Sequence, residues 1–453
     1  MQKNVGFVSF RFAGTDGVSL ETQKWADVLE ANNCTCFYLA GELETPPERS
    51  LLAEELHFQH PEIKEIYEKA FSQSERPRDL TRRLHHYRQI IKDRLYEFID
   101  TFNIELLIPQ NAITIPLNLP LGMALTEVIA ETKIPTIAHH HDFFWERKRF
   151  LRNCVWDVIN ACFPPHLPSV SHVCINTSGQ NQLALRTGIS STLIPNVMKF
   201  EEPPPGKDEY NADVREALGI ADDELLILQP TRVVQRKGIE HAIELVARLD
   251  RKAVFVISHA SGDEGYEYQQ RVKEFADLMK IRALFESDII GEKRGTTADG
   301  RKIYSLDDVY PYADFVTYPS LIEGFGNAFL EAIYFRKPIL VNNYSIYSHD
   351  IKPLGFDVIE MDNFISADTV RQTQELLDNP ERVKAMVETN YALGCRYFSY
   401  HILENKLWYL VQSFWGVTND EGCPDAPGFT KGDSGEPGVR DVPPGGGVNL
   451  GPK

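Results

Sequence analysis

Several kinds of segment are absent from this chain of 453 residues, and each absence excludes a class of protein. No apolar run reaches the roughly 20 residues that a membrane-spanning helix needs. The N-terminal segment, in which Arg11 interrupts a strand-like run, does not match a secretory signal peptide. The 7 cysteines follow no disulfide-framework spacing, which favours reduced thiols and a cytoplasmic protein.

Positive charge is scarce as well. The 65 Asp and Glu residues outnumber the 47 Lys and Arg residues, which gives a net charge of −18 at pH 7. General nucleic-acid binding depends on a basic face, so we expect no nucleic-acid partner. The G-x-G-x-x-G fingerprint of dinucleotide-binding domains is also missing. An anionic substrate would therefore need a local basic cluster that works against the charge of the whole chain.

The chain does contain a repeated alternation of strands and helices. Its length predicts two domains. Residues 5–10, 18–30 and 34–39 have the patterns of a strand, a helix and a strand, which open a Rossmann-like parallel sheet. The alternation restarts with a strand at 225–229, after a linker rich in proline and charge.

We therefore predict an α/β fold with two doubly wound, Rossmann-like domains. The predicted parts are an N-terminal domain (1–198) with a charged helical insertion (45–100) that shows no strand signal, a second domain (199–395), a C-terminal helix (396–418) and a Gly/Pro-rich tail (421–453). The tail is predicted to be disordered. An aromatic stripe in the last helical region is predicted to face the core; its members are Tyr400, Trp408, Tyr409 and Trp415.

The stretch from Tyr318 to Pro338 organises the second domain. A predicted strand at 315–318 is followed by a loop with two glycines and then by a helix at 328–335. A glycine loop that leads into a helix N-terminus can bind an anion through its free N–H groups. Two glutamates bracket the loop, and carboxylates accept hydrogen bonds from sugar hydroxyls. A plain strand-to-helix turn, with glutamates favoured by the helix dipole, is the alternative on spacing alone.

The segment E-G-F-G-N-A-F-L-E (323–331) resembles the E-x(7)-E signature of family 4 glycosyltransferases, which are retaining and depend on a nucleotide-sugar. The resemblance implies the GT-B fold, in which two Rossmann-like domains face a cleft and the last helix crosses back to the first domain. It implies transfer of glucose or mannose from a donor such as UDP-glucose or GDP-mannose. The donor-binding residues would be Gly17, Glu323 (to the sugar), Gly324, Phe325, Gly326, Asn327 and Glu331 (to the ribose).

A second motif supplies cations. The segment R-V-V-Q-R-K-G (232–238) resembles the family's G-R-L-x-x-x-K-G, which implies that Arg232 and Lys237 neutralise the donor diphosphate. Two fixed cations stabilise the charge that develops on a leaving diphosphate. Arg236 is predicted to lie on the surface. No Asp-x-Asp, the usual metal-binding signature of the other large glycosyltransferase fold, occurs in the chain, so we expect a metal-independent enzyme without a cofactor.

The acceptor side is predicted from the segment that follows a strand at 134–138. Three consecutive histidines there do not make a zinc site, and the segment resembles the family's His-Asp element. His141 would lie near the transferred sugar, with Asp142 beside it and His140 as the second choice. Arg147 and Arg149 suit an acceptor with a carboxylate or phosphate; a solvated basic helix face is the alternative.

The loop after the strand at 339–341 lacks the double glycine common in the family, so Asn342 and Tyr344 are predicted to line a distinctive acceptor pocket. The block H-D-F-F-W-E-R-K-R (141–149) resembles, more weakly, enzymes that build mannosylglucosylglycerate-type solutes. That resemblance implies a small, anionic, sugar-type acceptor. A GT-B disaccharide phosphorylase or synthase and a non-catalytic nucleotide-sugar-binding protein are the alternatives. A homo-oligomer is left open.

Overall fold

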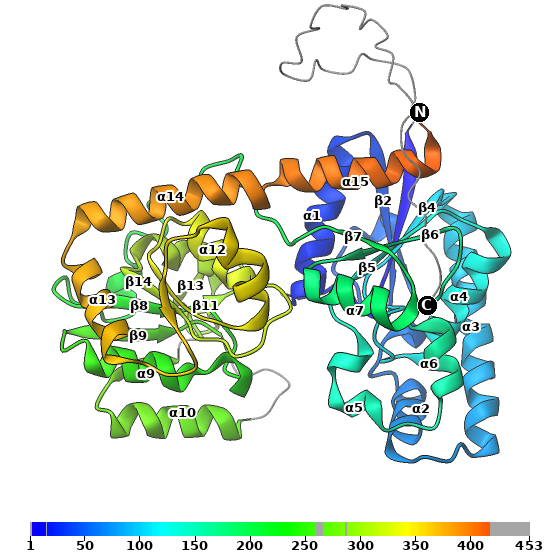
Figure 1. Cartoon of the computed structure of the whole chain (residues 1–453), viewed down its shortest axis with the longest axis horizontal. Helices are drawn as coiled ribbons and strands as arrows, with labels where there is room; N and C mark the ends of the chain where they lie inside the picture. Colours follow the sequence, from blue (N-terminus) through cyan, green and yellow to red (C-terminus); the bar gives the residue numbers. More distant parts are fainter. Residues whose placement is uncertain (1, 15, 260–265, 286–287, 417–453) are drawn as a thin grey trace, which may run out of the picture. The chain divides into compact units, whose positions relative to one another are not determined.

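A computed structural model describes residues 2–14, 16–259, 266–285 and 288–416 (Figure 1). The predicted tail at 421–453 lies outside these residues. Residues 1–414 belong to one unit that contains two large open sheets. Both sheets are parallel and carry helices, as expected of doubly wound domains.

The first sheet has seven strands in the order β3-β2-β1-β4-β5-β6-β7. The order runs outward from β1 in both directions, which is the Rossmann-like arrangement predicted from the first strands. The strands are β1 (Lys3–Val8), β2 (Cys34–Ala40), β3 (Ser50–Leu52), β4 (Leu106–Pro109), β5 (Thr136–His140), β6 (Val170–Cys174) and β7 (Ser191–Leu193). Its helices are α1 (Gly17–Ala31), α2 (Pro61–Ser72), α3 (Arg78–Phe102), α4 (Leu119–Thr132), α5 (Lys148–Leu151), α6 (Trp156–Cys162) and α7 (Thr177–Thr187).

The second sheet has six strands in the order β10-β9-β8-β14-β15-β16. They are β8 (Leu225–Gln229), β9 (Ala253–Ile257), β10 (Arg282–Phe285), β14 (Phe315–Tyr318), β15 (Ile339–Asn342) and β16 (Ile359–Met361). A small third sheet joins β11 (Ile290–Gly291), β12 (Gly295–Thr296) and β13 (Lys302–Ser305). The helices are α8 (Val214–Ala217), α9 (Ile239–Arg248), α10 (Glu267–Leu278), α11 (Leu306–Val309), α12 (Asn327–Tyr334), α13 (Ala367–Leu377), α14 (Pro380–Phe398) and α15 (Tyr400–Trp415).

The prediction of an insertion without strands at 45–100 is wrong in one place. β3 adds an edge strand to the first sheet through pairs such as Leu39–Leu51. Three residues are too few to show an alternating pattern, and an edge strand need not bury alternate side chains: Leu52 is 56% exposed. Most of the remaining segment is helical, and its helices α2 and α3 pack on one another.

The predicted aromatic stripe of the last helix is not its buried face. Tyr409 is 72% exposed, whereas α15 buries Leu403, Leu407 and Leu410. These leucines recur at helical spacing, so they lie on one face of α15, and this face rather than the aromatic one is buried. The same helix contacts the first sheet, because Lys406 Nζ donates to the Leu193 carbonyl at 2.8 Å.

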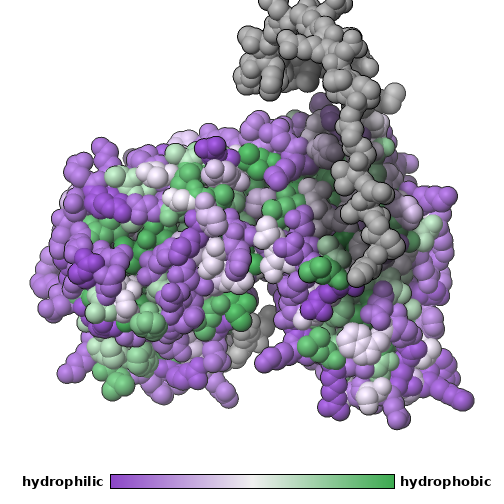
Figure 2. Space-filling model, viewed as in Figure 1, coloured by the Kyte–Doolittle hydropathy of each residue, from purple (hydrophilic) through white to green (hydrophobic). Residues whose placement is uncertain are grey.

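The surface agrees with the excess of charged residues in the sequence. Figure 2 shows a face dominated by hydrophilic residues, on which apolar residues gather only in small groups. Within the described ranges, no helix combines the length and the apolar character that a membrane crossing requires.

Candidate active site

The glycine loop between β14 and α12 is held in a shape that only glycine permits at Gly326. Its φ is +130°, and an added Cβ would lie 2.5 Å from the Tyr344 hydroxyl and 3.2 Å from the Tyr318 hydroxyl. The Tyr344 hydroxyl donates to the Phe325 carbonyl at 2.7 Å. The Phe325 side chain is buried and packs on Phe398, so only its backbone can meet a ligand.

A buried carboxylate and two cations meet at the start of this loop. Glu323, whose side chain is 9% exposed, accepts hydrogen bonds from Lys237 Nζ and, at 3.1 Å, from Arg236 Nη1. Lys237 Nζ also lies 5.6 Å from the centre of the Tyr318 ring. Arg232, by contrast, is exposed. The sequence predicted that Lys237 and Glu323 belong to one site, and the structure shows them in direct contact. Arg236 is a further member of this cluster.

Arg236 keeps 36% of its side chain exposed, in line with the predicted surface position, but the packing of its turn also joins it to Glu323. Residues Gln235–Lys237 form a 3₁₀ turn that ends at Gly238, with φ +59°. A Cβ on Gly238 would lie 2.7 Å from the Pro319 carbonyl, so the two backbones touch. Leu321 N donates to the Arg236 carbonyl at 2.8 Å. This contact brings two consecutive cations to Glu323.

The electrostatics of this cluster keep Glu323 ionised. Burial acts to raise the pKa of Glu323, but the charges of Lys237 and Arg236 outweigh it and hold the pKa below its ordinary value. Glu331, on α12, behaves in the opposite way. Burial raises the pKa of Glu331, although the charge of Lys24 and the hydrogen bond from Tyr310 Oη (3.1 Å) oppose that rise.

The head of α1 meets the same loop. The helix begins at Gly17, as predicted, and Asp16 caps it by accepting from Val18 N at 3.0 Å and Ser19 N at 3.2 Å. A Cβ on Gly17 would lie 3.7 Å from Asn327 Nδ2. Asn327 also accepts from Asn196 Nδ2 at 2.7 Å. Gly17 and Asn327, both predicted donor residues, are therefore neighbours.

The three consecutive histidines divide between the two sides of β5. His141 is partly exposed; its Nε2 donates to Gln110 Oε1 at 3.1 Å, and its carbonyl would lie 3.4 Å from a Cβ on Gly324. Burial lowers the pKa of His141 to about 4, so the ring is neutral at neutral pH. His140 is 1% exposed and bonds to Thr114 and, at 2.9 Å, to His172. Both its ring nitrogens are occupied, so the structure removes His140 from the acceptor residues.

The basic segment after His141 forms only a short helix, and its basic side chains are exposed, as in the alternative of a solvated surface. α5 is only four residues long, and Arg149 lies over the ring of its neighbour Phe150 at 4.8 Å. Arg147 Nε instead donates to Asp142, which also accepts from Asn111 Nδ2 at 2.8 Å. The structure thus brings Asp142 and Arg147 together beside His141. Arg149 takes no part in this ion pair.

Two further acceptor predictions are wrong. Asn342 is 1% exposed; its Nδ2 donates to the Ser320 carbonyl at 3.0 Å, and its Oδ1 accepts from Asn363 N at 2.8 Å. Tyr344 is 3% exposed and supports the glycine loop. The sequence could not show this, since the polar groups of both residues are satisfied by parts of the chain distant from them in sequence.

Sequence reasoning missed three residues that tie the two halves of the site together. Asn176, the N-cap of α7, donates to the Gly324 carbonyl at 2.7 Å. Asn196 binds Asn327, and its Ile-Pro-Asn context was a usable signal. Lys24 Nζ donates to the Val197 carbonyl at 2.6 Å and lies close enough to affect Glu331. Over the residues that the structure describes, no three His, Cys, Asp or Glu side chains are grouped as metal ligands.

Comparisons with known proteins bear on the family and the fold of the chain. No family model matches the chain. Mannosylglucosylglycerate synthase of Petrotoga mobilis is 31% identical over 390 residues, which cover 79% of this chain and 86% of that protein. The enzyme of the same name from Thermotoga maritima is 30% identical over 443 residues, which cover 89% of this chain and 98% of that protein. A crystal structure of a glycosyltransferase from Rickettsia africae has a TM-score of 0.65 at 14% identity and covers 92% of this chain and 100% of that one.

The solved structure establishes the fold, and the two relatives match over most of their own length. The chain therefore belongs to the family of the mannosylglucosylglycerate synthases, glycosyltransferases with the GT-B fold.

Proposed function

We propose that this protein is a retaining, family 4 hexosyltransferase that moves mannose from a nucleoside diphosphate sugar, such as GDP-mannose, to a hydroxyl of glucosylglycerate. The observation that carries the proposal is the cluster of Glu323, Lys237 and Arg236 at the Gly326 turn. The names of the two relatives supply the sugar and the acceptor. The acceptor is small and anionic, as the weaker sequence resemblance implies.

The donor half of this mechanism follows from the charges of the cluster. An arriving diphosphate competes with Glu323 for Lys237 and Arg236, and the exposed Arg232 adds a third cation. The N-terminus of α12, an eight-residue helix, adds N–H groups directed at the same anion. Fixed cations and dipoles stabilise the charge that develops on the departing diphosphate, so the chain's own residues do this work without a metal.

Glu323 and Glu331 then bind the polyol parts of the donor. Once the diphosphate holds Lys237, the carboxylate of Glu323 is available to hydroxyls of the transferred sugar. Glu331, on the next turn of α12, accepts from the ribose hydroxyls in place of the Tyr310 hydroxyl. Glu331 is carried by α12, and Glu323 lies in the turn between β14 and that helix, so both carboxylates are fixed in position, which favours a single orientation of the donor.

On the acceptor side, the His141 backbone lies close to the glycine loop: its carbonyl would be 3.4 Å from a Cβ on Gly324. Because Nε2–H donates to Gln110, the lone pair of the neutral ring lies on Nδ1. Nδ1 can accept a hydrogen bond from a hydroxyl of the sugar or of the acceptor. The pair of Arg147 and Asp142 lies beside it and offers a guanidinium for the glycerate carboxylate.

A matrix of donors and acceptors tests the proposal. UDP-glucose, GDP-mannose and ADP-glucose are each incubated with glucosylglycerate, its phosphorylated analogue, glycerate or glucose, and products are identified by mass spectrometry and by NMR of the new anomeric centre. We expect a mannosylated glucosylglycerate with the anomeric configuration of the donor. Inversion contradicts the retaining mechanism. A reaction that needs inorganic phosphate indicates a phosphorylase, and donor binding without any transfer indicates a non-catalytic protein.

A further inference from the structure

A second arginine–aspartate pair lies on the acceptor side, in the loop between β1 and α1. Arg11 Nε donates to Asp16 Oδ2 at 3.2 Å. The same kind of contact joins Arg147 to Asp142. Burial lowers the pKa of His141, and the charges of Asp142 and Asp16 both oppose that effect, so both pairs lie near the His141 ring. Only the pair that contains Arg147 has a role in the proposed function.

The loop that carries Arg11 also lies beside a donor residue. It runs from the end of β1 to Gly17, at the carboxyl edge of the first sheet, where α/β proteins bind their ligands. A Cβ on Gly17 would lie 3.7 Å from Asn327 Nδ2, at the start of α12. Because Asp16 directly precedes Gly17, its ion pair keeps the Arg11 guanidinium at the same end of α1. A small acceptor bound to Arg11 can therefore place its sugar ring, which carries the reacting hydroxyl, at the glycine loop.

The guanidinium of Arg11 is fixed in orientation, yet most of its donors are unused. Asp16 holds it through Nε, and its carbon lies 5.8 Å from the centre of the Phe58 ring. Among the described residues, Nε is the only guanidinium atom of Arg11 with a hydrogen-bond partner. The side chain is 33% exposed, so a solute can reach the N–H groups of Nη1 and Nη2.

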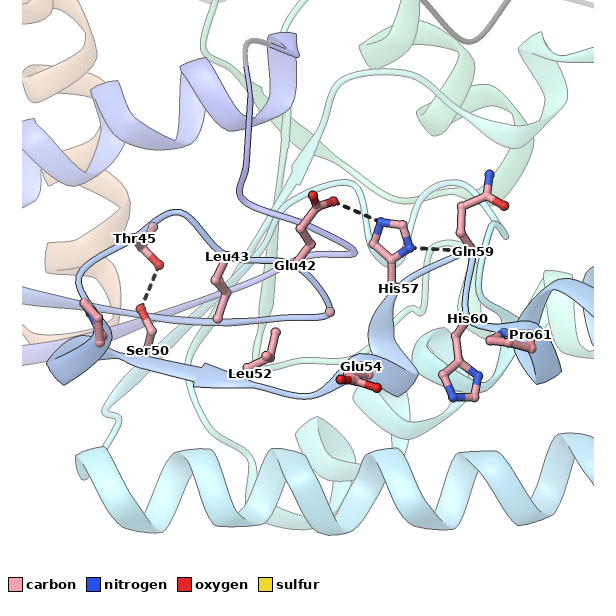
Figure 3. A pocket seen from close by; sticks show the side chains of 12 residues that line it. Glu42, Leu43, Thr45, Ser50, Leu52, Glu54, His57, Gln59, His60 and Pro61 are labelled. Atoms are coloured by element: carbon pink, nitrogen blue, oxygen red, sulfur yellow. Dashed lines mark hydrogen bonds and ion pairs between the residues drawn. The ribbon is translucent and has the colours of Figure 1, made fainter.

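The acidic groups of the neighbouring segments already have donors of their own. Asp16 also accepts from two N–H groups and one hydroxyl of α1. Glu44 Oε2 accepts from a backbone N–H of the Arg11 loop at 3.0 Å. Glu42, in the cavity that Figure 3 shows, faces His57 Nε2 at 3.3 Å. These contacts leave the outer N–H groups of Arg11 to a ligand that accepts hydrogen bonds.

A carboxylate is the ligand group that fits these donors. A guanidinium presents its N–H groups in one plane, and their spacing matches the two oxygens of a carboxylate. His57 does not compete for the same group, because burial lowers its pKa; the charge of Arg11 lowers it further, although Glu42 opposes this. Arg11 is thus the cation that this part of the acceptor side offers.

We propose that Arg11 binds the carboxylate of the acceptor and determines the preference for an acidic acceptor over a neutral one. Arg11 is then a second guanidinium on the acceptor side, besides that of Arg147. The assignment rests on the proposed function for the identity of the acceptor. Its own content is the recognition of a carboxylate, which a neutral analogue of the acceptor tests.

Glucosylglycerol has a hydroxymethyl group where glucosylglycerate has the carboxylate, so a comparison of the two acceptors isolates this contact. In Arg11→Gln we expect kcat/KM for glucosylglycerate to fall about 10- to 100-fold, as the loss of a charge-assisted hydrogen bond implies, and that for glucosylglycerol to change less than about threefold. Arg11→Lys, which keeps the charge without the planar fork, should lie between Arg11→Gln and the wild type. The control Arg94→Gln breaks an exposed ion pair with Glu97 and should change neither value.

The two acceptors also separate recognition from a structural role. An equal loss for both acceptors in Arg11→Gln would show that Arg11 only supports its loop, and an unchanged preference for glucosylglycerate would show that it does not bind the carboxylate; either result overturns the assignment. If the wild type uses both acceptors equally well, the transferase proposal stands and the carboxylate contact is wrong. Arg11→Lys provides the same comparison if Arg11→Gln does not fold.

Ligand-observed NMR with glycerate in the presence of GDP separates the failure of this inference from failure of the proposed function. It decides the case in which the wild type transfers nothing to either acceptor. Glycerate binding that weakens in Arg11→Gln and persists in Arg94→Gln supports a carboxylate site even then. Binding that is absent from the wild type, or equal in the wild type and Arg11→Gln, overturns it.

Discussion

Gly326→Ala is the substitution whose effect the structure predicts in most detail. The native φ of +130° is one that L residues rarely adopt, and holding alanine there costs roughly 1–3 kcal/mol. The new Cβ would also lie 2.5 Å from the Tyr344 hydroxyl, which must move and lose its bond to the Phe325 carbonyl. That loss adds roughly 1 kcal/mol. We therefore expect the free energy of unfolding to fall by about 2–4 kcal/mol.

Gly355→Ala is the matched control for the backbone. Gly355 has φ +90°, and no heavy atom of the described residues lies within 4 Å of its added Cβ, so only backbone strain should appear. Tyr344→Phe tests the contact itself. In the presence of Gly326→Ala it removes the clashing oxygen, so the double variant should lose less stability than the two single variants together.

Urea unfolding at pH 7.5 measures the stabilities, and titration calorimetry measures the affinity for the nucleoside diphosphate. Because the turn sets the position of the α12 N-terminus, Gly326→Ala should weaken diphosphate binding about tenfold or more, whereas Gly355→Ala should not. Strict additivity in the double variant would refute the steric part of the reasoning. An unchanged diphosphate affinity in Gly326→Ala would refute the assignment of the loop to the donor.

The remaining predictions concern charge. Lys237→Met should lower kcat roughly 100-fold, because it removes a group that stabilises the charge developing on the diphosphate. The control Lys252→Met, which breaks an exposed ion pair, should leave steady-state rates unchanged. Equal effects of the two substitutions would contradict the role of Lys237. Glu331→Ala should weaken nucleoside diphosphate binding about tenfold by calorimetry, and an unchanged affinity would contradict the ribose contact. Burial holds the pKa of His172 at about 4, against an ordinary value of 6.5. As the pH falls below 6.5 the unfolded chain takes up this proton first, so the free energy of unfolding should drop by up to about 1.4 kcal/mol per pH unit for this group. His172→Asn should flatten that slope in urea unfolding between pH 6.5 and 4, and an identical slope would show that the histidine is not buried neutral.

The helix and strand pattern was determined by the sequence alone because it depends on near neighbours. The strand at Phe315–Tyr318, the glycine loop and the helix that follows were placed within a residue of their positions. Gly17 was correctly placed at the start of its helix. Such signals come from apolar spacing and from the backbone freedom of glycine, and neither needs a tertiary partner. The three-residue strand at Ser50–Leu52 was missed because it is too short to show a pattern.

Only the tertiary structure decided which polar side chains meet. Alternation along β5 puts His139 and His141 on one side and His140 on the other, but both faces of the sheet are covered by helices, so the sequence does not say which side is the site. Arg236 and Lys237 are adjacent in the chain, and their shared carboxylate lies 86 residues away from Lys237. Asn342 and Tyr344 looked like ligand groups until the structure showed their protein partners. A local pattern fixes where a side chain is attached, whereas its hydrogen-bond partners come from segments that only folding brings near.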